Sequence, residues 1–311
     1  MTKDTIGVDI SKDHLDAHRV SDGASRRFTN DRNGHRAFLT WAGQPGARIV
    51  YEPTGPYHRA FERRLAEAGY ALVKVNPRRA RRFAEAIGRL AKTDRLDAAM
   101  LARMGALLGL EAHPPRSPIL NDLKDLQMAR EALVKNRTAA KNRAKNLTLP
   151  ILKRHNAEQL RQIERQMAAI ETEIMALIEA DPDLARRFAI LVSIPGVSAI
   201  TAFVLLIDMP ELGTLGNGQA ASLAGLAPVA RQSGQWTGRA FIRGGRANVR
   251  QALYMPALVA MRFNPDLKAK YHHLIAAGKP AKKAITAIMR KLVVLANALL
   301  RDNRNWAADL P

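Results

Sequence analysis

The sequence predicts an α/β domain at the N-terminus, then a long helical segment, then a mainly helical C-terminal segment. In the first part of the chain, short apolar runs typical of strands alternate with helical patterns. A stiff stretch, His113-Pro114-Pro115-Arg116-Ser117-Pro118, interrupts this alternation, and the residues after it keep a helical composition as far as Asp181-Pro182. We therefore expect three segments, at residues 1–113, 114–184 and 185–311.

The first segment is expected to form a mixed sheet covered by helices. The strands are expected at residues 5–10, 17–20, around Phe28, 48–52 and 71–75. The helices are expected at residues 34–41, 57–68, 79–88 and 94–108. This order of elements is that of an α/β layout, and it suits a ribonuclease H-like fold, in which acids at strand ends and on one late helix meet.

The second segment combines a heptad repeat with a positive charge. Apolar residues recur in alternating steps of three and four at Leu160, Ile163, Met167, Ile170, Ile174 and Leu177. A core-facing helix within one chain and an intermolecular coiled coil both fit this seam. Residues 116–165 contain twelve Lys or Arg against five Asp or Glu, which favours phosphate contact by residues such as Lys141, Arg143 and Lys145.

The composition narrows the class of protein further. Over 311 residues the formal net charge is +21, and a soluble protein this basic usually has a polyanionic partner, by default nucleic acid. The alternative is a basic surface without such a partner. The absence of cysteine excludes disulfides, thiolate metal sites and cysteine nucleophiles. The N-terminus has no signal-peptide pattern and no apolar stretch is long enough to span a bilayer, so we expect a cytoplasmic protein with no membrane partner.

Four carboxylates in the first segment are candidate metal ligands. Asp9 lies in the first expected strand, Glu52 ends a later one, and Asp94 and Asp97 share a face at the start of a helix. Acids gathered at one point repel each other unless a cation lies between them, and hard oxygen ligands suit Mg²⁺ or Mn²⁺. Two such ions could bind the attacking and leaving oxygens of a phosphodiester. Alternatively, these are a solvated strand-end acid, a helix-capping Asp94 and an ordinary surface acid.

The third segment contains a candidate nucleophile in a strongly basic region. From residue 231 to 301 the chain has fourteen Lys or Arg and a single acid, Asp266. Ser233 precedes a glycine in a stretch with no clear helical or strand period, so it is either a turn serine or a nucleophile that needs an activator. No histidine is near it in sequence, and a metal held by the N-terminal acids could serve instead. The residues that could bind the phosphate under attack are Arg231, Arg239, Arg243, Arg246 and Arg250.

Several motifs resemble the DEDD transposases of insertion sequence family 110. In the first segment they are Gly7-Val8-Asp9-Ile10-Ser11-Lys12, Glu52-Pro53-Thr54-Gly55-Pro56-Tyr57-His58, Val75-Asn76-Pro77 and Lys92-Thr93-Asp94-Arg95-Leu96-Asp97-Ala98. In the third they are Ile194-Pro195-Gly196-Val197, Gly225-Leu226-Ala227-Pro228, Ser233-Gly234, Gly244-Gly245, Arg250, Gly278-Lys279-Pro280 and Met289-Arg290-Lys291-Leu292. The resemblance covers nearly the whole chain, in order, and is weakest in the central helices. Pro53 departs from the family, where Ala or Ser commonly follows the glutamate.

The resemblance implies a RuvC-like N-terminal domain, a helical linker and a C-terminal transposase domain. It also implies RNA-guided DNA recombination, in which a structured non-coding RNA from the element, the bridge RNA, pairs with target and donor DNA. The family's catalytic acids would be Asp9, Glu52, Asp94 and Asp97, and its nucleophile Ser233, which would form a covalent phosphoserine link to DNA. RNA would be bound by the central helices and by the basic stretch Arg78, Arg79, Arg81 and Arg82.

Because recombination needs several active sites, we expect a dimer or tetramer. Two other functions remain open at this point. A Holliday-junction-type nuclease would use the same acids with water as the nucleophile, and a non-catalytic nucleic-acid-binding protein would use neither the acids nor the serine.

Overall fold

The computed structural model describes residues 4–53, 55–88, 94–112, 117–238 and 240–307. The chain forms two compact units, Met1–Ser117 and Pro118–Pro311. The expected boundary at 113/114 lies outside the described residues, and the division into three segments stays a prediction.

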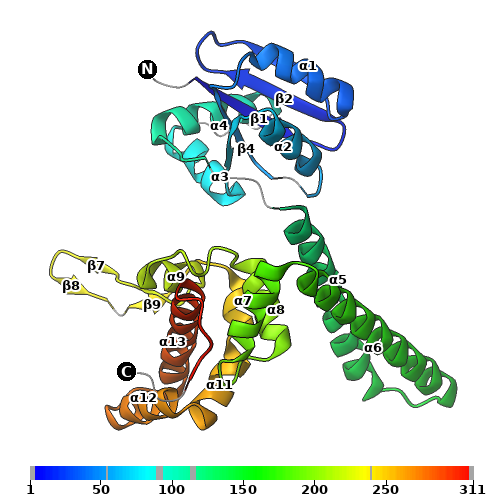
Figure 1. Cartoon of the computed structure of the whole chain (residues 1–311), viewed down its shortest axis with the longest axis vertical. Helices are drawn as coiled ribbons and strands as arrows, with labels where there is room; N and C mark the ends of the chain where they lie inside the picture. The colour runs from blue at the N-terminus through cyan, green and yellow to red at the C-terminus, as the bar shows by residue number, and fades with distance from the viewer. Residues whose placement is uncertain (1–3, 54, 89–93, 113–116, 239, 308–311) are drawn as a thin grey trace. The chain divides into compact units, whose positions relative to one another are not determined.

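Unit 1 is built on a five-stranded mixed sheet (Figure 1). Its strands are β1 (Thr5–Ile10), β2 (His14–Arg19), β3 (Ser25–Thr29), β4 (Arg48–Tyr51) and β5 (Ala71–Lys74), in the order β3-β2-β1-β4-β5. The first three strands are antiparallel, whereas β4 pairs parallel with both β1 and β5. Its helices are α1 (Arg32–Ala42), α2 (His58–Glu67), α3 (Pro77–Ala86) and α4 (Asp94–Leu108). The predicted α/β class is confirmed, and this arrangement is compatible with a ribonuclease H-like fold.

The two faces of the sheet are covered by different helices, because successive side chains of a strand point to opposite faces. Residues of α1 and α2 pack against one face in a cluster that includes Ile6, Val8, Phe38 and Phe61. The other face packs against α3 and α4 in a smaller cluster that includes Val50, Val73, Ala80 and Met104. Burying one such side chain stabilises the fold by about 1.5–3 kcal/mol, so the α1–α2 face supplies more of the hydrophobic stabilisation.

Unit 2 begins with two long helices, α5 (Pro118–Ala144) and α6 (Pro150–Glu179), which pack side by side as an antiparallel hairpin (Figure 1). Within the predicted heptad seam, Ile163, Met167 and Ile174 are buried. The seam therefore packs within the chain, as the first of the two alternatives required. Ile174 and Ile178 also join Leu123 in the hydrophobic core that continues into the rest of the unit.

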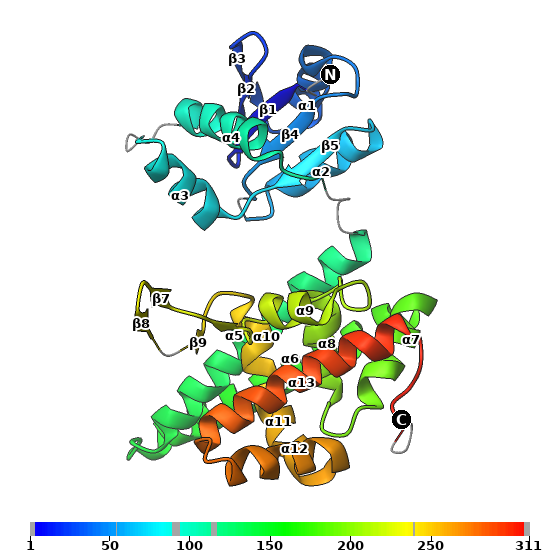
Figure 2. The same cartoon turned by 90° about the vertical axis from the view of Figure 1, so that its left-hand side faces the viewer.

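The rest of unit 2 is mainly helical, as predicted. Its helices are α7 (Pro182–Val192), α8 (Ala199–Asp208), α9 (Asn217–Leu223), α10 (Ala247–Ala252), α11 (Tyr254–Phe263), α12 (Pro265–Ala276) and α13 (Ala281–Arg301). Helix α13 runs across the unit beside α11 and α12 (Figure 2), and its side chains Ile288, Leu292 and Leu299 lie at the centre of the core.

A narrow two-stranded ribbon, residues 228–242, interrupts these helices. It consists of β6 (Pro228–Val229) paired with β9 (Phe241–Ile242), and β7 (Gln232–Ser233) paired with β8 (Trp236–Thr237). Each strand is two residues long and exposed, so there is no buried face to impose an alternating pattern on the sequence. This explains why the sequence showed no strand period here. Within the described parts of the chain, every helix is too short or too polar to cross a membrane.

Candidate active site

Asp9 and Glu52 lie side by side near the C-terminal ends of the neighbouring parallel strands β1 and β4. The parallel register of β1 and β4 ends with Val8 opposite Tyr51, so the residues that follow this pair are Asp9 after Val8 and Glu52 after Tyr51. Neighbouring strands are about 4.8 Å apart, which brings these two carboxylates close together. Both residues are partly buried.

Both carboxylates belong to the sheet face that α4 covers. Two residues before Asp9 is Gly7, which faces α4, and two residues before Glu52 is Val50, which packs in the cluster with α4. A strand repeats its direction every second residue, so this alternation, extended by one residue beyond the end of β4, puts Asp9 and Glu52 on the same face. The alternation of the two strands therefore assigns these acids to one face.

Helix α4 lies directly on the sheet, and this contact places Asp97. A Cβ atom on Gly7 would be 2.0 Å from the Ala98 carbonyl oxygen and 2.3 Å from the Ala102 nitrogen, so main chain meets main chain at this point. Further along the helix, Gly105 lies against Thr5 and Val50. Since Thr5 precedes Gly7 in β1, the helix runs antiparallel to the strand, and its N-terminal end lies toward Asp9. Asp97 directly precedes Ala98 and is partly buried.

The four predicted ligands thus fall into two groups. The fold brings Asp9, Glu52 and Asp97 to one end of one face, while Asp94 is the first residue of α4 and its side chain lies outside the described residues. None of the three described acids is without an interaction partner. Among the described side chains, no three acids or histidines are close enough to hold one ion. The donor set fits a hard divalent cation by its chemistry and its shared edge, and metal binding stays a prediction.

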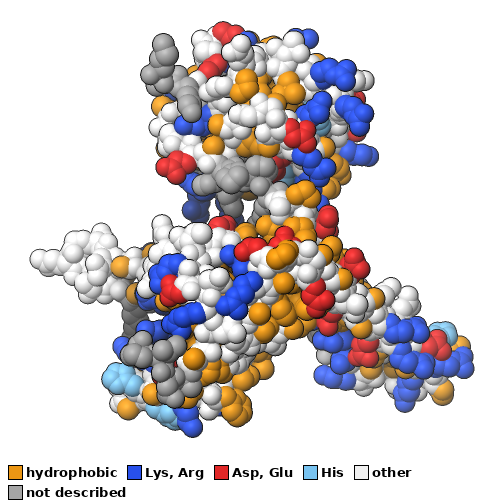
Figure 3. Space-filling view, in the orientation of Figure 1, with side chains coloured by type: hydrophobic (Ala, Val, Ile, Leu, Met, Phe, Trp, Pro, Cys, Tyr) orange, Lys and Arg blue, Asp and Glu red, His pale blue; other side chains and the backbone are white. Residues whose placement is uncertain are grey.

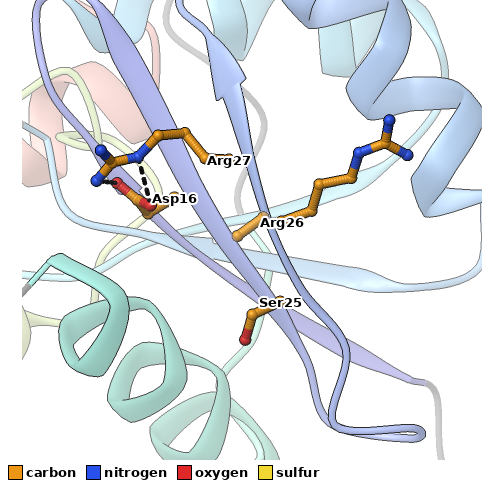
Figure 4. Close-up of a pocket in the computed structure, with 5 residues that line it drawn as sticks. Asp16, Ser25, Arg26 and Arg27 are labelled. Carbon is orange, nitrogen blue, oxygen red and sulfur yellow. Dashed lines mark hydrogen bonds and ion pairs between the residues drawn. The ribbon is translucent and has the colours of Figure 1, made fainter.

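A further acid, Asp16, flanks this row and was missed by sequence reasoning. It lies directly opposite Asp9 in the β1–β2 register, and opposite residues of antiparallel strands share a face. Arg27 of β3 holds it in a bidentate ion pair, with Nε 2.9 Å from Oδ1 and Nη2 2.8 Å from Oδ2 (Figure 4). The Arg27 guanidinium compensates the Asp16 charge beside Asp9. Only the register could have revealed this pair, because eleven residues separate its members.

A partly buried polar network supports the end of β4, directly before Glu52. Lys74 Nζ lies 2.8 Å from Oε2 of the buried Glu62, and His58 Nε2 lies 3.4 Å from the same oxygen. Burial and the Lys74 ammonium lower the pKa of His58, so its imidazole is neutral near pH 7. Burial, with a contribution from Glu62, raises the pKa of the Tyr51 hydroxyl. These contacts join α2 and β5 to the last residue of β4, directly before Glu52.

The predicted RNA-contact residues are all on exposed surfaces. In α3, Arg78, Arg79, Arg81 and Arg82 are exposed around the buried anchor Ala80, and Arg81 Nε is 3.4 Å from Glu85. Basic side chains also gather at the tip of the α5–α6 hairpin (Figure 3), where Lys141, Arg143 and Lys145 are exposed. Arg143 is partly engaged there, since its Nη2 donates to Gln159 Oε1 at 2.9 Å. Nucleic-acid binding at both places stays a prediction.

Ser233 lies at the tip of the ribbon, which projects from the helices of unit 2 (Figure 1). A two-residue turn, Gly234-Gln235, joins it to Trp236 on the facing strand. Gly234 has φ +55°, as the first central residue of a type II′ turn requires. The serine is exposed to solvent, as a nucleophile toward a large substrate must be.

The root of the ribbon is a close contact between two glycine turns, Gly225 and Gly244-Gly245. A Cβ on Gly245 would be 2.1 Å from the Gly225 nitrogen, so no other residue fits there. Arg250 donates to the Gly244 carbonyl at 2.9 Å. Arg246 forms a bidentate pair with Glu211, at 2.7 and 2.6 Å, and donates to the Asp208 carbonyl.

The five arginines predicted to bind phosphate therefore differ in their surroundings. Arg246 and Arg250 are engaged at the root, whereas Arg231 and Arg243 are exposed. Arg239 lies outside the described residues. Phosphate binding stays a prediction for all five, and of the described arginines the exposed Arg231 and Arg243 are the most accessible to a phosphate.

Two family models match the chain. Residues 6–151 match the model of the IS110-type DEDD transposase domain, and residues 188–272 match that of the transposase IS116/IS110/IS902 family. Pilin gene-inverting proteins from Moraxella bovis and Moraxella lacunata are each 29% identical to the chain over 316 residues, with 98% of both proteins covered. An insertion element IS110 protein of 43.6 kDa from Streptomyces coelicolor is 32% identical over 172 residues, covering 53% of this chain and 40% of that one.

Proposed function

The chain belongs to the IS110 family of transposases and is a DNA recombinase, and from that premise we propose that it cuts and rejoins DNA through a covalent phosphoserine intermediate. Ser233 would be the nucleophile, and Asp9, Glu52, Asp94 and Asp97 would be the metal-binding acids. The main support for this proposal is that the β1–β4 register and the α4 contact at Gly7 bring Asp9, Glu52 and Asp97 to one end of one face of the sheet.

The acids would hold divalent cations, Mg²⁺ or Mn²⁺, through their carboxylate oxygens. When bound, such ions supply positive charge that polarises a phosphodiester and favours the deprotonated form of a hydroxyl. The chain's part is to hold the ligands in place. The Asp16–Arg27 ion pair and the Glu62 network would support the parts of β1 and β4 that lie next to Asp9 and Glu52.

Ser233 would supply the covalent step. Its Oγ attacks phosphorus, the bond from phosphorus to one deoxyribose oxygen breaks, and that oxygen leaves with a proton. The serine proton passes to solvent or to a nearby base. In the reverse step, a deoxyribose oxygen of the exchanged strand attacks the phosphoserine and releases Ser233, so the number of phosphodiester bonds is conserved. The exposed arginines near the serine would bind the non-bridging oxygens.

The acids and the serine lie in different units, so this chemistry requires them to act on the same phosphate, from one chain or from two. A homodimer or tetramer would supply the several sites that strand exchange needs. The substrates would be donor and target DNA, both paired with a structured bridge RNA from the element. The exposed arginines of α3 and the basic tip of the α5–α6 hairpin would bind the phosphates of that RNA.

The decisive experiment traps the covalent adduct. Donor DNA, the element's RNA and Mg²⁺ are incubated with the protein, the reaction is stopped with denaturant, and protein–DNA adducts are separated by electrophoresis and located by mass spectrometry. Ser233→Ala should abolish the adduct, whereas Thr237→Ala, which removes an exposed ribbon hydroxyl four residues away, should retain it. Asp9→Asn should abolish cleavage, whereas the exposed Asp13→Asn should not.

The same assay separates the alternatives. Cleavage by Ser233→Ala at the normal rate, with no adduct in the natural protein, would indicate a nuclease that uses water. Nucleic-acid binding without any Mg²⁺-dependent cleavage would indicate a non-catalytic protein.

A further inference from the structure

Trp236 is a large aromatic side chain placed in solvent beside the serine. Its side chain is 56% exposed, and it lies directly across the ribbon from Ser233. It belongs to none of the hydrophobic clusters that the described residues form. Packing within its own unit therefore does not explain why an indole is held at this position.

The ribbon nevertheless fixes the indole ring. Gly238 lies beneath it: a Cβ atom there would be 2.3 Å from the ring atom Cη2 and 2.7 Å from Cζ3. The Gly238 N–H donates to the Arg231 carbonyl at 2.8 Å, which holds the two strands together at this level. The Arg231 guanidinium is 6.0 Å from the ring centroid, within the range of a cation–π contact. The ring is thus seated on main chain from one side and exposed on the other.

Three groups of different chemistry share one side of the ribbon. Residues directly opposite each other in an antiparallel pair point to the same side, so Ser233 and Trp236 do so. Arg231 also lies on this side, because its guanidinium is 6.0 Å from the centroid of the Trp236 ring. A cation, a hydroxyl and an exposed aromatic ring lie next to each other on this side.

The charge of the region indicates which partner would cover the ring. Residues 228–250 contain five arginines and no acid. A nucleic acid strand complements this charge, and every base offers an aromatic face for stacking on an indole. An apolar protein surface would use the ring but would leave the cations unpaired.

We propose that Trp236 stacks on a base of the DNA strand next to the phosphodiester that Ser233 attacks. A base and its phosphate are joined by one sugar, which matches the adjacency of Trp236 and Ser233 across two paired strands. Stacking would take that base out of the duplex and fix the strand relative to the hydroxyl. The inference rests on the proposed function of Ser233.

Fluorescence tests the contact apart from catalysis. The full-length variant Trp41→Phe/Trp306→Phe leaves Trp236 as the sole tryptophan. A short mixed-sequence single-stranded DNA should quench its emission as the base stacks. Trp236→Leu should weaken binding of this DNA about tenfold or more, since alanine substitutions at base-stacking aromatics have effects of this size. Trp236→Phe should keep most of the affinity.

Two further variants make the test specific. Gly238→Ala keeps the indole but removes its seat, so it should weaken DNA binding like Trp236→Leu. Phe263→Leu changes another exposed aromatic, 71% exposed at the end of α11, and should leave binding unchanged. Melting temperatures should stay at the natural value in Trp236→Leu, because the side chain packs in no core.

The proposal and the proposed function can fail separately. Normal adduct formation without DNA quenching, and with full DNA affinity in Trp236→Leu, would overturn the stacking contact and leave the serine chemistry intact. Quenching by RNA of the same sequence but not by DNA would also overturn it. Quenching that persists in Ser233→Ala supports stacking, even if the natural protein forms no adduct.

Discussion

Gly7→Ala tests whether the α4–β1 contact assembles the acidic edge. Glycine is the only residue type without a Cβ, and at Gly7 main-chain atoms of α4 occupy the space that a Cβ would need. The nearest is the Ala98 carbonyl oxygen at 2.0 Å, whereas ordinary contact begins at 3.4 Å. The helix must therefore move away by about 1.4 Å, the difference between these distances, or the strand must bend.

The cost of this movement follows from what the helix buries. Leu101 and Met104 of α4 are about 1% exposed and pack against the sheet, so the helix cannot move without loosening this cluster. Overpacking a core by one carbon usually costs about 1–3 kcal/mol, and rigid main chain places Gly7→Ala at the upper end, about 3 kcal/mol. For a unit of this size, that lowers the melting temperature by roughly 10 °C.

The functional cost is separate from the loss of stability. Asp97 moves with α4, and a misplacement of about 1 Å in catalytic geometry can lower the rate about 100-fold. We therefore expect Gly7→Ala to lose Mg²⁺-dependent cleavage even at temperatures where it stays folded. Ala102→Gly should not restore it, because the colliding atoms are main chain.

Calorimetry of the full-length protein and hydrogen exchange of the β1 and α4 peptides measure these effects. Gly218→Ala is the matched control: the new Cβ meets nothing within 4 Å, so this helix position should be unchanged or slightly stabilised. Gly105→Ala meets side-chain atoms of Val50 and Thr5 rather than main-chain atoms, at longer distances, and should cost less than Gly7→Ala. If Gly7→Ala unfolds and exchanges like the natural protein, α4 does not rest on β1 as described.

Two other predictions concern stability. Burial is the main cause that lowers the pKa of both His35 and His58 from 6.5, so the unfolded chain takes up protons first as the pH falls. The contribution of these two histidines to the free energy of unfolding is complete above about pH 6.5 and is lost as the pH falls toward their lowered pKa values. Urea unfolding of unit 1 at pH 7.5 and at pH 5.5 should show this loss. Equal free energies of unfolding at the two pH values would contradict it. Arg246→Gln should cost about 1–2 kcal/mol, because it breaks the partly exposed pair with Glu211 and a bond to the Asp208 carbonyl. The exposed Arg243→Gln should change the free energy of unfolding by less than about 0.5 kcal/mol and should lower DNA affinity instead. If Arg246→Gln lowers DNA affinity and Arg243→Gln lowers stability, Arg246 is the phosphate contact.

Sequence patterns located the elements that carry the acids, because those elements have strong local signals. The buried runs of β1 and β4 were placed to within about a residue, and the helix bearing Asp97 was placed at its observed bounds. Strand alternation then assigns Asp9 and Glu52 to the face of α4. What alternation cannot supply is register, which is decided by packing between distant segments.

The missing parts of the site depend on register or on long-range pairing. Asp16 becomes a neighbour of Asp9 only once β1 and β2 are aligned, and Arg27 neutralises it from a third strand. Glu62 and Lys74 meet from α2 and β5, twelve residues apart, and nothing local marks Glu62 as buried. His58 lies partly buried, with its Nε2 atom 3.4 Å from the Glu62 carboxylate, and no local pattern marks this contact.

The arginines of the ribbon region differ in role: some stabilise the root of the ribbon, and others are exposed beyond it. Gly225 and Gly245 touch main chain to main chain, and Arg246 and Arg250 fasten the turns around them, so these motif residues hold the root. Beyond the root, nothing buried constrains the ribbon as far as Ser233. Acids that hold a cation need a rigid, partly buried edge, whereas a nucleophile that meets a DNA strand needs reach. If Ser233 is the proposed nucleophile, a firm root with an exposed tip would give the serine both reach and a fixed direction, and the root glycines would then be as necessary as the hydroxyl.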